Sequence, residues 1–334
     1  MNWIFVGAST IAAQYMIGAV RAQAGQDVVW AVSGSPDRVA GWAERHVIPN
    51  ATTDLAEALA DHDASAVYIS STNEKHFAQA MAAISSGKHV LCEKPLALNQ
   101  ADALEMVAAA RDAGVIFGTN HHLRCSGTHR AIRDLIASGR IGKVLSLRVH
   151  HAVHLPPNLQ GWRINDAAAG GGVIPDITVH NADVARFLLG EDPKCVVAQM
   201  ASSGMGEGVE DSAMSVWAMP SGAMVMSHES FTHRFAGNGL EVHGETGSIF
   251  AQSVMTQEPV GSVELVTEDG RETISCSPHS LYAQGVSDFT KATLGEGRPA
   301  ADGIDGVKSL TVALAVREAA RTGKRMDVDY EGVS

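Results

Sequence analysis

Two short segments carry side chains that could act on a carbonyl group. In CEKP, residues 92–95, Lys94 follows Glu93, and an ammonium group can polarise a carbonyl oxygen. In the second segment, Asp176 and His180 lie four residues apart, and a carboxylate beside an imidazole can fix its tautomer and tune its pKa. We therefore take Lys94, Asp176 and His180 as candidate catalytic residues. A surface Glu–Lys pair and a solvated helix face are the alternatives.

The helix expected at 173–190 places Asp176 and His180 on one face, because residues four apart in an α-helix are neighbours. Its core-facing side is marked by Ile174, Ile177, Ala185 and Leu188. Three glycines at 170–172 precede this helix and allow backbone to come close to a ligand. Pro175 is compatible with a first helical turn.

The first third of the chain alternates short apolar segments with helical ones. Strands are expected at 2–7, 28–33, 64–71, 88–95 and 115–122, and helices at 11–23, 36–46, 54–61, 76–87 and 98–114. This alternation predicts an α/β fold, with a Rossmann-type domain over 1–121 whose parallel sheet has helices on both faces. Lys94 then follows a strand, at the sheet edge where ligands bind.

The remainder, 122–334, has a different pattern. Helices are expected at 128–142, 173–190, 281–294 and 305–322, and strands at 144–153, 195–203, 212–219, 223–232, 239–244, 248–252 and 263–268. Short turns such as PSG, ETG and EDG separate several strands, which is typical of antiparallel hairpins. We predict an α+β domain with an open, mainly antiparallel sheet, whose C-terminal helices pack back toward the N-terminal domain.

The stretch VGASTIA at 6–12 stands where a dinucleotide-binding G-x-G-x-x-G loop would stand. Gly7 keeps the first glycine, while Ser9 and Ala12 replace the other two. Each replacement is small, and the Ser9 hydroxyl can donate to a phosphate oxygen. Thr10 and Ile11 offer backbone N–H groups at a helix N-terminus, which favours an anion. With a strand before it and a helix after it, the loop predicts a dinucleotide site rather than an ordinary strand–helix turn.

The end of the second strand bears on which dinucleotide binds. NAD enzymes usually carry Asp or Glu there to hold the ribose 2′-hydroxyl, whereas this chain has Ser33 followed by Gly34. Ser33 can hydrogen-bond a 2′-phosphate, and Arg38 can bind it by charge. The sequence therefore predicts NADP(H). A solvated Arg38 on the helix surface is the alternative.

Composition narrows the class of protein. The net charge of −12 disfavours nucleic acid and anionic membranes as partners. The four cysteines are far apart, which favours free thiols in a cytoplasmic protein. No metal site is expected, because adjacent histidines on a strand point to opposite faces. A monomer or a small homo-oligomer with a small-molecule substrate is expected.

Together these features resemble one known family. A G-x-x-x-x-A loop, EKP at a strand end and D-x-x-x-H after GGG are similar to the glucose–fructose oxidoreductase/inositol dehydrogenase/MocA family, over the whole chain. Within it, the stretches at 118–124, 154–163 and 170–183 resemble bacterial reductases of a cyclic sugar ketone. The resemblance implies an enzyme that reduces a sugar ketone with NADPH.

The resemblance also implies roles for individual residues. The cofactor phosphates would be bound by Ser9, Thr10, Ile11, Ala12, Ser33, Gly34 and Arg38. The rest of the cofactor would be lined by Ser71, Thr72, Asn73, Glu74, His76, Glu93, Lys94, Asn120, Trp162, Arg163 and Tyr282. The substrate would be handled by Lys94, Asp176 and His180.

Under this hypothesis negative charge develops on the carbonyl oxygen during reduction. Lys94 donates a hydrogen bond to that oxygen, His180 supplies the proton, and Asp176 orients His180. The sequence leaves open which of Lys94 and His180 gives the proton. The alternative functions are a polyol or inositol dehydrogenase that uses NAD, a non-catalytic NADP-binding sensor, and an unrelated α/β binding domain fused to a β-sheet scaffold.

Overall fold

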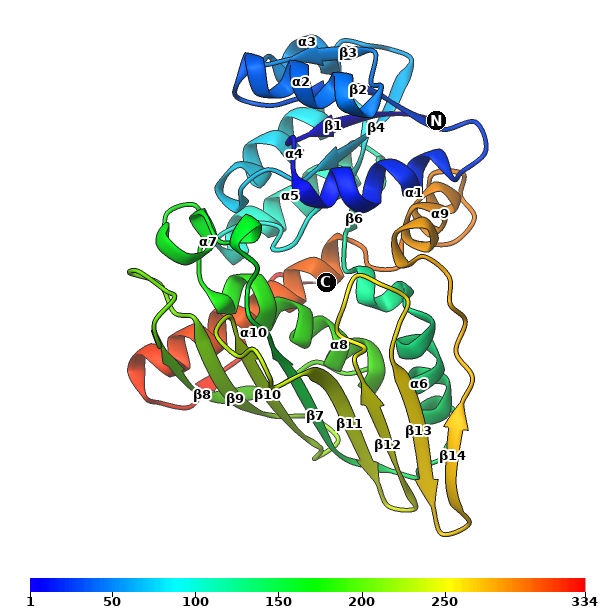
Figure 1. Cartoon of the computed structure of the whole chain (residues 1–334), viewed down its shortest axis with the longest axis vertical. Coiled ribbons are helices and arrows are strands. Elements are labelled where there is room, and N and C mark those ends of the chain that lie inside the picture. Colours follow the sequence, from blue (N-terminus) through cyan, green and yellow to red (C-terminus); the bar gives the residue numbers. More distant parts are fainter. Residues whose placement is uncertain (334) are drawn as a thin grey trace. The chain divides into compact units, whose positions relative to one another are not determined.

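The computed structural model describes residues 1–333 and divides into two compact units (Figure 1). The first unit contains residues 1–122 and 282–307, and the second contains residues 123–281 and 308–333. The chain therefore leaves the first unit after His122 and re-enters it at Tyr282.

The first unit is built on a six-stranded sheet in the order β3-β2-β1-β4-β5-β6, in which every neighbouring pair is parallel. Its strands are β1 (Asn2–Val6), β2 (Asp27–Val32), β3 (Asn50–Thr52), β4 (Ala64–Ile69), β5 (His89–Cys92) and β6 (Phe117–Thr119). The central strands are nearly continuous apolar runs, as expected for strands buried on both faces. The predicted Rossmann-type sheet is confirmed, although β3 was not foreseen.

Helices α1 (Ile17–Arg21), α2 (Pro36–His46), α3 (Leu55–Leu59), α4 (His76–Ser85) and α5 (Gln100–Asp112) connect these strands. The helix after β1 starts at Thr10 and Ile11 and continues as a π-helix, η1 (Ala12–Met16), before the regular α1. Val20 and Ala80 illustrate the buried sides of α1 and α4, since neither side chain is exposed.

The C-terminal part of the chain completes the first unit. Helix α9 (Leu281–Thr293) packs there through Phe289, whose ring centroid lies 5.4 Å from that of Trp3. Gln26 Nε2 donates to Thr290 Oγ1 at 2.9 Å. Next to α10 (Gly303–Thr322), the hydroxyl of Thr119 donates to the carbonyl of Asp302 at 3.0 Å. These contacts bind a late segment of the chain to the earliest strands.

The second unit contains a nine-stranded sheet in the order β14-β13-β12-β11-β7-β10-β9-β8-β15. Its strands are β7 (Val144–Ala152), β8 (Cys195–Ala201), β9 (Ser212–Ala218), β10 (Met224–Ser230), β11 (Asn238–Gly244), β12 (Gly247–Gln252), β13 (Ser262–Thr267), β14 (Gly270–Ile274) and β15 (Met326–Asp327). All pairs are antiparallel except β10 with β7. The predicted mainly antiparallel sheet is confirmed, whereas β14 and β15 were not foreseen.

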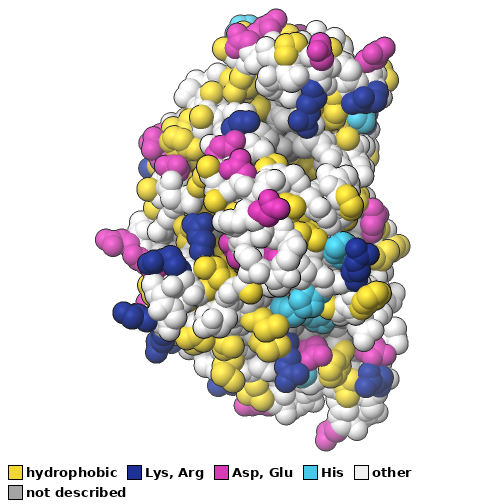
Figure 2. All heavy atoms as spheres, turned by 60° about the vertical axis from the view of Figure 1, so that its left-hand side comes forward, with side chains coloured by type: hydrophobic (Ala, Val, Ile, Leu, Met, Phe, Trp, Pro, Cys, Tyr) yellow, Lys and Arg dark blue, Asp and Glu magenta, His cyan; other side chains and the backbone are white. Residues whose placement is uncertain are grey.

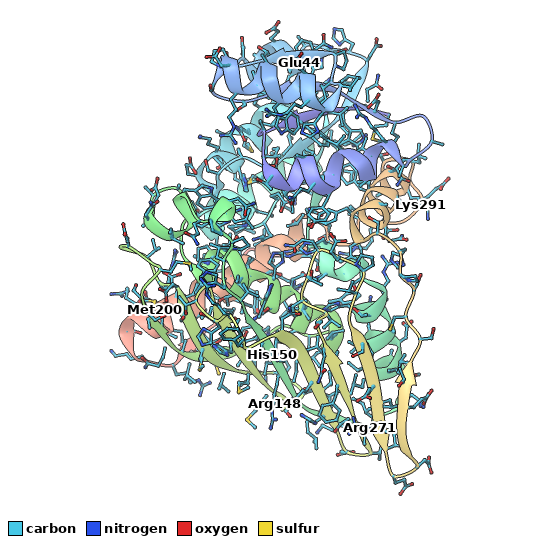
Figure 3. All side chains as sticks on the ribbon, viewed as in Figure 1. Glu44, Arg148, His150, Met200, Arg271 and Lys291 are labelled. Carbon is cyan, nitrogen blue, oxygen red and sulfur yellow. The ribbon has the colours of Figure 1, made fainter. Side chains whose placement is uncertain are left out.

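Helices α6 (Gly127–Ala137), α7 (Trp162–Asn165), α8 (Val179–Leu189) and the later part of α10 belong to the second unit. Helix α8 is buried on nearly every side and follows directly on a π-helix, η5 (Ile174–Thr178). On the sheet, Arg148 of β7 pairs with Glu241 of β11, and Arg271 of β14 pairs with Glu264 of β13. Figure 3 labels the two arginines. These exposed pairs stand in solvent, where each contributes little to stability.

The surface mixes charges of both signs. In Figure 2, acidic, basic and apolar side chains are interspersed, and several histidines gather at one place. In the second unit, His228 and His233 have ring centroids 5.2 Å apart. No group of three or more His, Cys, Asp and Glu side chains within residues 1–333 has the arrangement of a metal site. None of the helices in the same range is both long and apolar enough to cross a membrane.

Candidate active site

The loop after β1 requires glycine at its first position. Gly7 has a φ of +102°, and a Cβ atom there would lie 2.7 Å from the backbone carbon of Ser70. The Ser9 hydroxyl donates to Ser70 Oγ at 2.8 Å and accepts from the N–H of Ala12 at 3.2 Å. Ser9 thus caps the helix while holding the loop against the end of β4. Thr10 and Ile11 lie in the first turn, whose N–H groups have no intrahelical partner in any helix.

Arg38 of α2 lies beside the same loop. Its Nη2 donates to the carbonyl of Ala8 at 2.8 Å, so the guanidinium stands next to the Gly7 turn. Ser33 follows β2 directly and is fixed by its N–H, which donates to the carbonyl of Thr52 at 3.2 Å. Gly34 is exposed, and a Cβ there would meet nothing within 4 Å. A positive charge and two small residues without a carboxylate therefore gather at the ends of β1 and β2.

The segment after β4 is held by its own polar side chains. The Ser71 hydroxyl donates to Gln79 Oε1 at 2.6 Å, and the Thr72 hydroxyl donates to Glu74 Oε1 at 2.7 Å. Asn73 is 5% exposed. These two hydrogen bonds and the burial of Asn73 fix the loop at the carboxyl end of the sheet, where we predicted that it lines a cofactor.

His76 has a supporting position in this segment. Its ring is fully buried, its Nδ1 lies 2.8 Å from the carbonyl oxygen of Pro95, and its Nε2 lies 3.2 Å from that of Ser71. Burial lowers the pKa of His76. The ring therefore lies between the loop after β4 and the loop after β5, which carries Lys94, and in its neutral form it donates to one of the two carbonyls.

Glu93 organises the end of β5. Its Oε1 accepts from the hydroxyl of Tyr68 and from Nδ2 of Asn120, both at 2.6 Å. Withdrawal from water raises the pKa of Glu93, although both hydrogen bonds lower it. Lys94 follows, partly exposed, and the Lys94–Pro95 peptide bond is cis. The structure thus brings Glu93, Lys94 and Asn120 together at the ends of β5 and β6.

Tyr282 lies in a stack of three rings within the first unit. Its ring is 4.8 Å from that of Tyr15 and 5.2 Å from that of His122, with interplanar angles of 16° and 11°. Tyr282 is 2% exposed. It was expected in the second domain, but it belongs to the first unit, and neither Tyr15 nor His122 was foreseen as its neighbour.

In the second unit, Asp176 and His180 lie on either side of a change in helix type. Asp176 is within the π-helical turn η5, and His180 is in the first turn of α8. The regular helix expected over this segment is therefore wrong in its first turn. Single π-helical turns are often found at functional sites. The side chain of Asp176 is 16% exposed, and His180 is 7% exposed.

Trp162 and Arg163 occupy the short helix α7. The Arg163 guanidinium lies 4.7 Å from the centre of the Trp162 ring, and its Nε lies 3.5 Å from Asp176 Oδ1. Arg163 Nη1 also donates to the carbonyl of Leu159 at 3.3 Å. The structure therefore brings Arg163, predicted at the cofactor, together with Asp176, predicted at the substrate.

The turn before η5 depends on a carboxylate that the sequence did not reveal. Glu210 accepts the N–H of Ile174 on Oε1 at 3.1 Å and the N–H of Val173 on its backbone carbonyl at 2.9 Å. Burial raises the pKa of Glu210. Gly172 has a φ of +114°, and a Cβ there would collide with the Glu210 carboxyl group. Glycine at position 172 therefore permits the Glu210 carboxyl group to lie close to the backbone.

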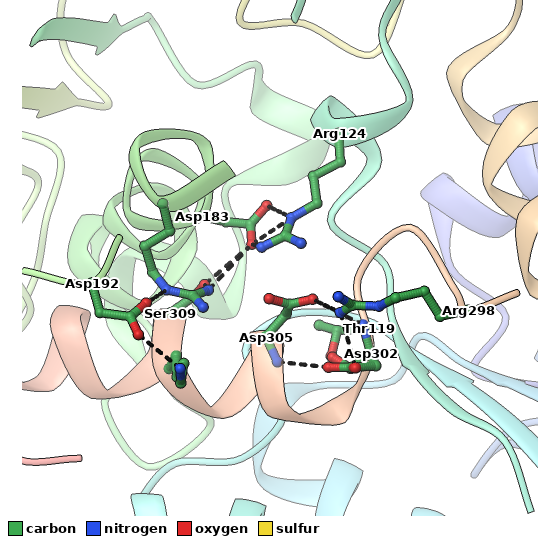
Figure 4. A network of polar contacts seen from close by, with 10 residues as sticks. Thr119, Arg124, Asp183, Asp192, Arg298, Asp302, Asp305 and Ser309 are labelled. Carbon is green, nitrogen blue, oxygen red and sulfur yellow. Dashed lines mark hydrogen bonds and ion pairs between the residues drawn. The ribbon is translucent and has the colours of Figure 1, made fainter. Parts of the chain in front are cut away.

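Helix α8 is fixed in the second unit by a buried ion pair (Figure 4). Arg124 Nη2 lies 2.7 Å from Asp183 Oδ1, and Arg124 Nε lies 2.8 Å from Oδ2. Ser309 Oγ also donates to Asp183 Oδ1 at 3.3 Å. A bidentate arginine–carboxylate pair fixes geometry as well as charge. Asp183, one turn after His180, thus has a structural role.

A further histidine lies near His180, and another is buried on α6, which packs against α8. The ring of His151 on β7 is 6.4 Å from that of His180. His129 on α6 is fully buried, and burial lowers its pKa to about 4, so it is neutral at pH 7. Neither was predicted at the site, since only the pairing of strand β7 with its neighbours places His151 under the helix.

Two family models match this chain. Residues 1–121 match an oxidoreductase family with an NAD-binding Rossmann fold, and residues 129–250 match the GFO/IDH/MocA C-terminal domain. A 1,5-anhydro-D-fructose reductase from Ensifer adhaerens is 51% identical to this chain over 98% of both proteins. The chain belongs to the GFO/IDH/MocA family.

Other GFO/IDH/MocA relatives are more distant. A myo-inositol 2-dehydrogenase from Thermotoga maritima is 28% identical over 87% of this chain and 88% of its own. The crystal structure of an aldose-aldose oxidoreductase from Caulobacter crescentus has the same fold, with a TM-score of 0.90 at 24% identity over 98% of this chain and 99% of that one. This GFO/IDH/MocA protein is an oxidoreductase, and its first unit is an NAD(P)-binding Rossmann domain.

Proposed function

We propose that this protein reduces the 2-keto group of 1,5-anhydro-D-fructose with NADPH and so forms 1,5-anhydro-D-mannitol. The observation that carries this proposal is the 51% identity, over 98% of both chains, to a 1,5-anhydro-D-fructose reductase. The stretches 118–124, 154–163 and 170–183 of this chain, singled out from the sequence, support it. They contain Asn120, Trp162, Arg163, Asp176 and His180.

The preference for NADPH rests on the ends of β1 and β2. A carboxylate after β2 would repel a 2′-phosphate, and Ser33 stands there instead. Arg38 is already held beside the Gly7 turn by its bond to Ala8, so its charge is available at the edge where the adenosine ribose would lie. Ser9, Thr10, Ile11 and Ala12 would hold the pyrophosphate at the helix start.

The residues around β5 and β6 would receive the nicotinamide end. NADPH, when bound, supplies a hydride to the ketone carbon. Asn120 donates a hydrogen bond to Glu93, and the two side chains would position the nicotinamide ribose. Lys94 donates a hydrogen bond to the carbonyl oxygen, where negative charge develops.

His180 supplies the proton that this oxygen needs. Asp176 fixes the orientation of the imidazole, and Arg163 in turn holds Asp176. Lys94 belongs to the first unit and His180 to the second. Ser71, Thr72, Asn73, Glu74 and His76 shape the loop beside the cofactor, while Tyr282 and Trp162 provide its aromatic walls. We further expect a cytoplasmic protein that is a monomer or a small homo-oligomer.

The rival function is oxidation of a polyol or an inositol with NAD, as the name of the Thermotoga maritima relative would suggest. The deciding experiment measures NADPH and NADH oxidation with 1,5-anhydro-D-fructose beside a panel of ketoses, 2-ketoaldoses and inososes, and the reverse reaction with myo-inositol. We expect the highest kcat/KM with anhydrofructose and NADPH. A higher kcat/KM for inositol with NAD would overturn the proposal.

A further inference from the structure

Three polar side chains form a buried cluster between β10 and α8. Asn181 Nδ2 donates to Ser227 Oγ at 3.0 Å and to Glu229 Oε1 at 3.1 Å. The Ser227 hydroxyl donates to the same Glu229 oxygen at 2.5 Å. All three side chains have zero exposure. The cluster is therefore a buried network shared by a strand and a helix, in which Asn181 Oδ1 and Glu229 Oε2 have no hydrogen-bond partner among residues 1–333.

The network lies at the junction between η5, which contains Asp176, and α8, which contains His180. Asn181 directly follows His180 in the first turn of α8. Thr178, also fully buried, ends the π-helical turn that contains Asp176, and its hydroxyl lowers the pKa of Glu229 but makes no hydrogen bond with the residues that the structure describes. Strand β10 also packs directly against η5. Glu229 on β10 thus accepts a hydrogen bond from the residue just after His180, on a strand that packs against the turn just before it.

Holding α8 with a buried carboxyl group costs free energy of folding. A carboxyl group in an apolar interior is unfavourable, and a well-packed apolar side chain of similar volume often stabilises a protein as well or better. Helix α8 already has a strong attachment in the Arg124–Asp183 pair one turn further on. Packing alone would therefore be served by leucine at position 229.

We propose that Glu229 is a positioning residue for the reaction, which fixes the junction between η5 and α8 through Asn181 and Ser227 and thereby aims His180. The inference rests on the proposed function, in which His180 acts on the substrate. Glu229 itself acts through these neighbours. A helix held only by apolar packing would leave the imidazole free to shift, and a displacement of about 1 Å can cost roughly a hundredfold in rate.

The test compares Glu229→Leu with Glu229→Gln. Leucine fills the volume and removes the hydrogen bonds, whereas glutamine keeps an acceptor for Asn181 and Ser227. We expect E229L to lower kcat by about 10- to 100-fold, with KM and the Kd for NADPH within about twofold of wild type and a melting temperature that is unchanged or higher. E229Q should stay within about threefold of wild type in kcat.

A matched control separates positioning from general weakening. Val263→Ala removes a fully buried side chain on β13 and should lower the melting temperature while kcat stays at the wild-type level. An E229L protein with wild-type kcat, or an E229Q protein as slow as E229L, would overturn the inference. If E229L does not fold, Ser227→Ala takes its place, and unchanged turnover in S227A would count against positioning.

A second readout does not need a substrate. The His180 ring can be followed by NMR through a pH titration of its carbon-bound protons in the free enzyme. E229L should change the chemical shift and apparent pKa of His180, and E229Q should leave both close to wild type. Unchanged His180 signals in E229L overturn the inference even if anhydrofructose proves not to be the substrate, so the two proposals can fail separately.

Discussion

The guanidinium of Arg163 lies 3.5 Å from the carboxylate of Asp176, and both side chains are mostly buried, at 29% and 16% exposure. The pair joins the short helix α7 to the π-helical turn before α8. Asp176 therefore has a partner other than the imidazole that the sequence assigned to it. We therefore expect Arg163 and Asp176 to act together, as an ion pair.

Removal of Arg163 should impair catalysis through Asp176. In Arg163→Ala the carboxylate loses its cationic partner in a partly buried place, so we expect kcat/KM to fall by about tenfold or more, equivalent to roughly 1.4 kcal/mol or more. Steady-state kinetics with NADPH and the ketone checks this. Arg148→Ala removes an exposed arginine from β7 and should leave kcat/KM unchanged. Equal activity of the two variants would contradict the role of the pair.

His180→Ala tests the proton donor. Loss of a positioned general acid should lower kcat by ~10²–10⁴-fold. The Kd for NADPH should remain within about twofold, because the cofactor-binding residues belong mainly to the first unit. Fluorescence titration with NADPH measures the Kd, and initial rates measure kcat. The control is His228→Ala on β10, and a normal kcat in the His180 variant would remove this residue from the mechanism.

Arg38→Ala tests the cofactor preference. The change removes a positive charge beside the Gly7 turn, so the KM for NADPH should rise by about 10- to 100-fold while that for NADH changes little. Arg45→Ala is the matched control, because Arg45 is an exposed arginine near the other end of α2. A ratio of NADPH to NADH efficiency that is the same in both variants would show that Arg38 does not read the 2′-phosphate.

Gly172→Ala tests the close approach of Glu210. Both Gly172 and Gly204 have positive φ angles, of +114° and +126°, but only the first would place a methyl group against another residue. Gly204→Ala thus measures backbone strain alone. We expect Gly172→Ala to lower the unfolding free energy by about 1–3 kcal/mol more than Gly204→Ala, with a larger loss of kcat. Urea denaturation and rate measurements compare them, and equal losses would indicate that Glu210 moves aside.

Glu229 should give stability a pH dependence. Burial raises its pKa from 4.5 to about 7 in the folded protein. Between these values the unfolded chain has lost the proton and the folded protein keeps it, so the contribution of Glu229 to stability is fully present below pH 4.5 and is lost as the pH rises through 7. Glu229→Gln removes this titration and should gain up to roughly 3 kcal/mol relative to wild type between pH 4.5 and 7.

Urea denaturation of wild type and E229Q at a series of pH values measures the difference. His129 contributes the opposite slope, since its folded pKa of about 4 makes stability fall as the pH drops below 6.5. Because both proteins contain His129, its contribution cancels in the comparison. Parallel pH curves for the two proteins would show that Glu229 is ionised throughout.

Local sequence patterns predicted most of the fold. The alternation of strands and helices over 1–121 and the turn signals in the second half are local, and they gave the two sheets. The π-helical turns at 12–16 and 174–178 were missed, because their residues have the same periodicity as a regular helix. The parallel pairing of β7 with β10 was also missed, since no local pattern specifies which distant strand becomes a neighbour.

The candidate site shows the same limit. Lys94, Asp176 and His180 could be predicted as candidates because their spacing is local. Glu229 was not, because a glutamate between a histidine and a serine on a strand is typical of an exposed position, and only the packing of α8 makes it buried. Glu210 and the partnership of Arg124 with Asp183 depend in the same way on contacts between residues far apart in the chain.

The stack of Tyr15, Tyr282 and His122 has a topological consequence. The rings of His122 and Tyr282 are 5.2 Å apart, so the residue at which the chain leaves the first unit lies next to the residue at which it returns. Residues 123–281, the larger of the two segments that form the second unit, thus begin and end beside stacked aromatic rings. Because packing within the first unit holds these two ends together, that unit has no long flexible loop to close at this point.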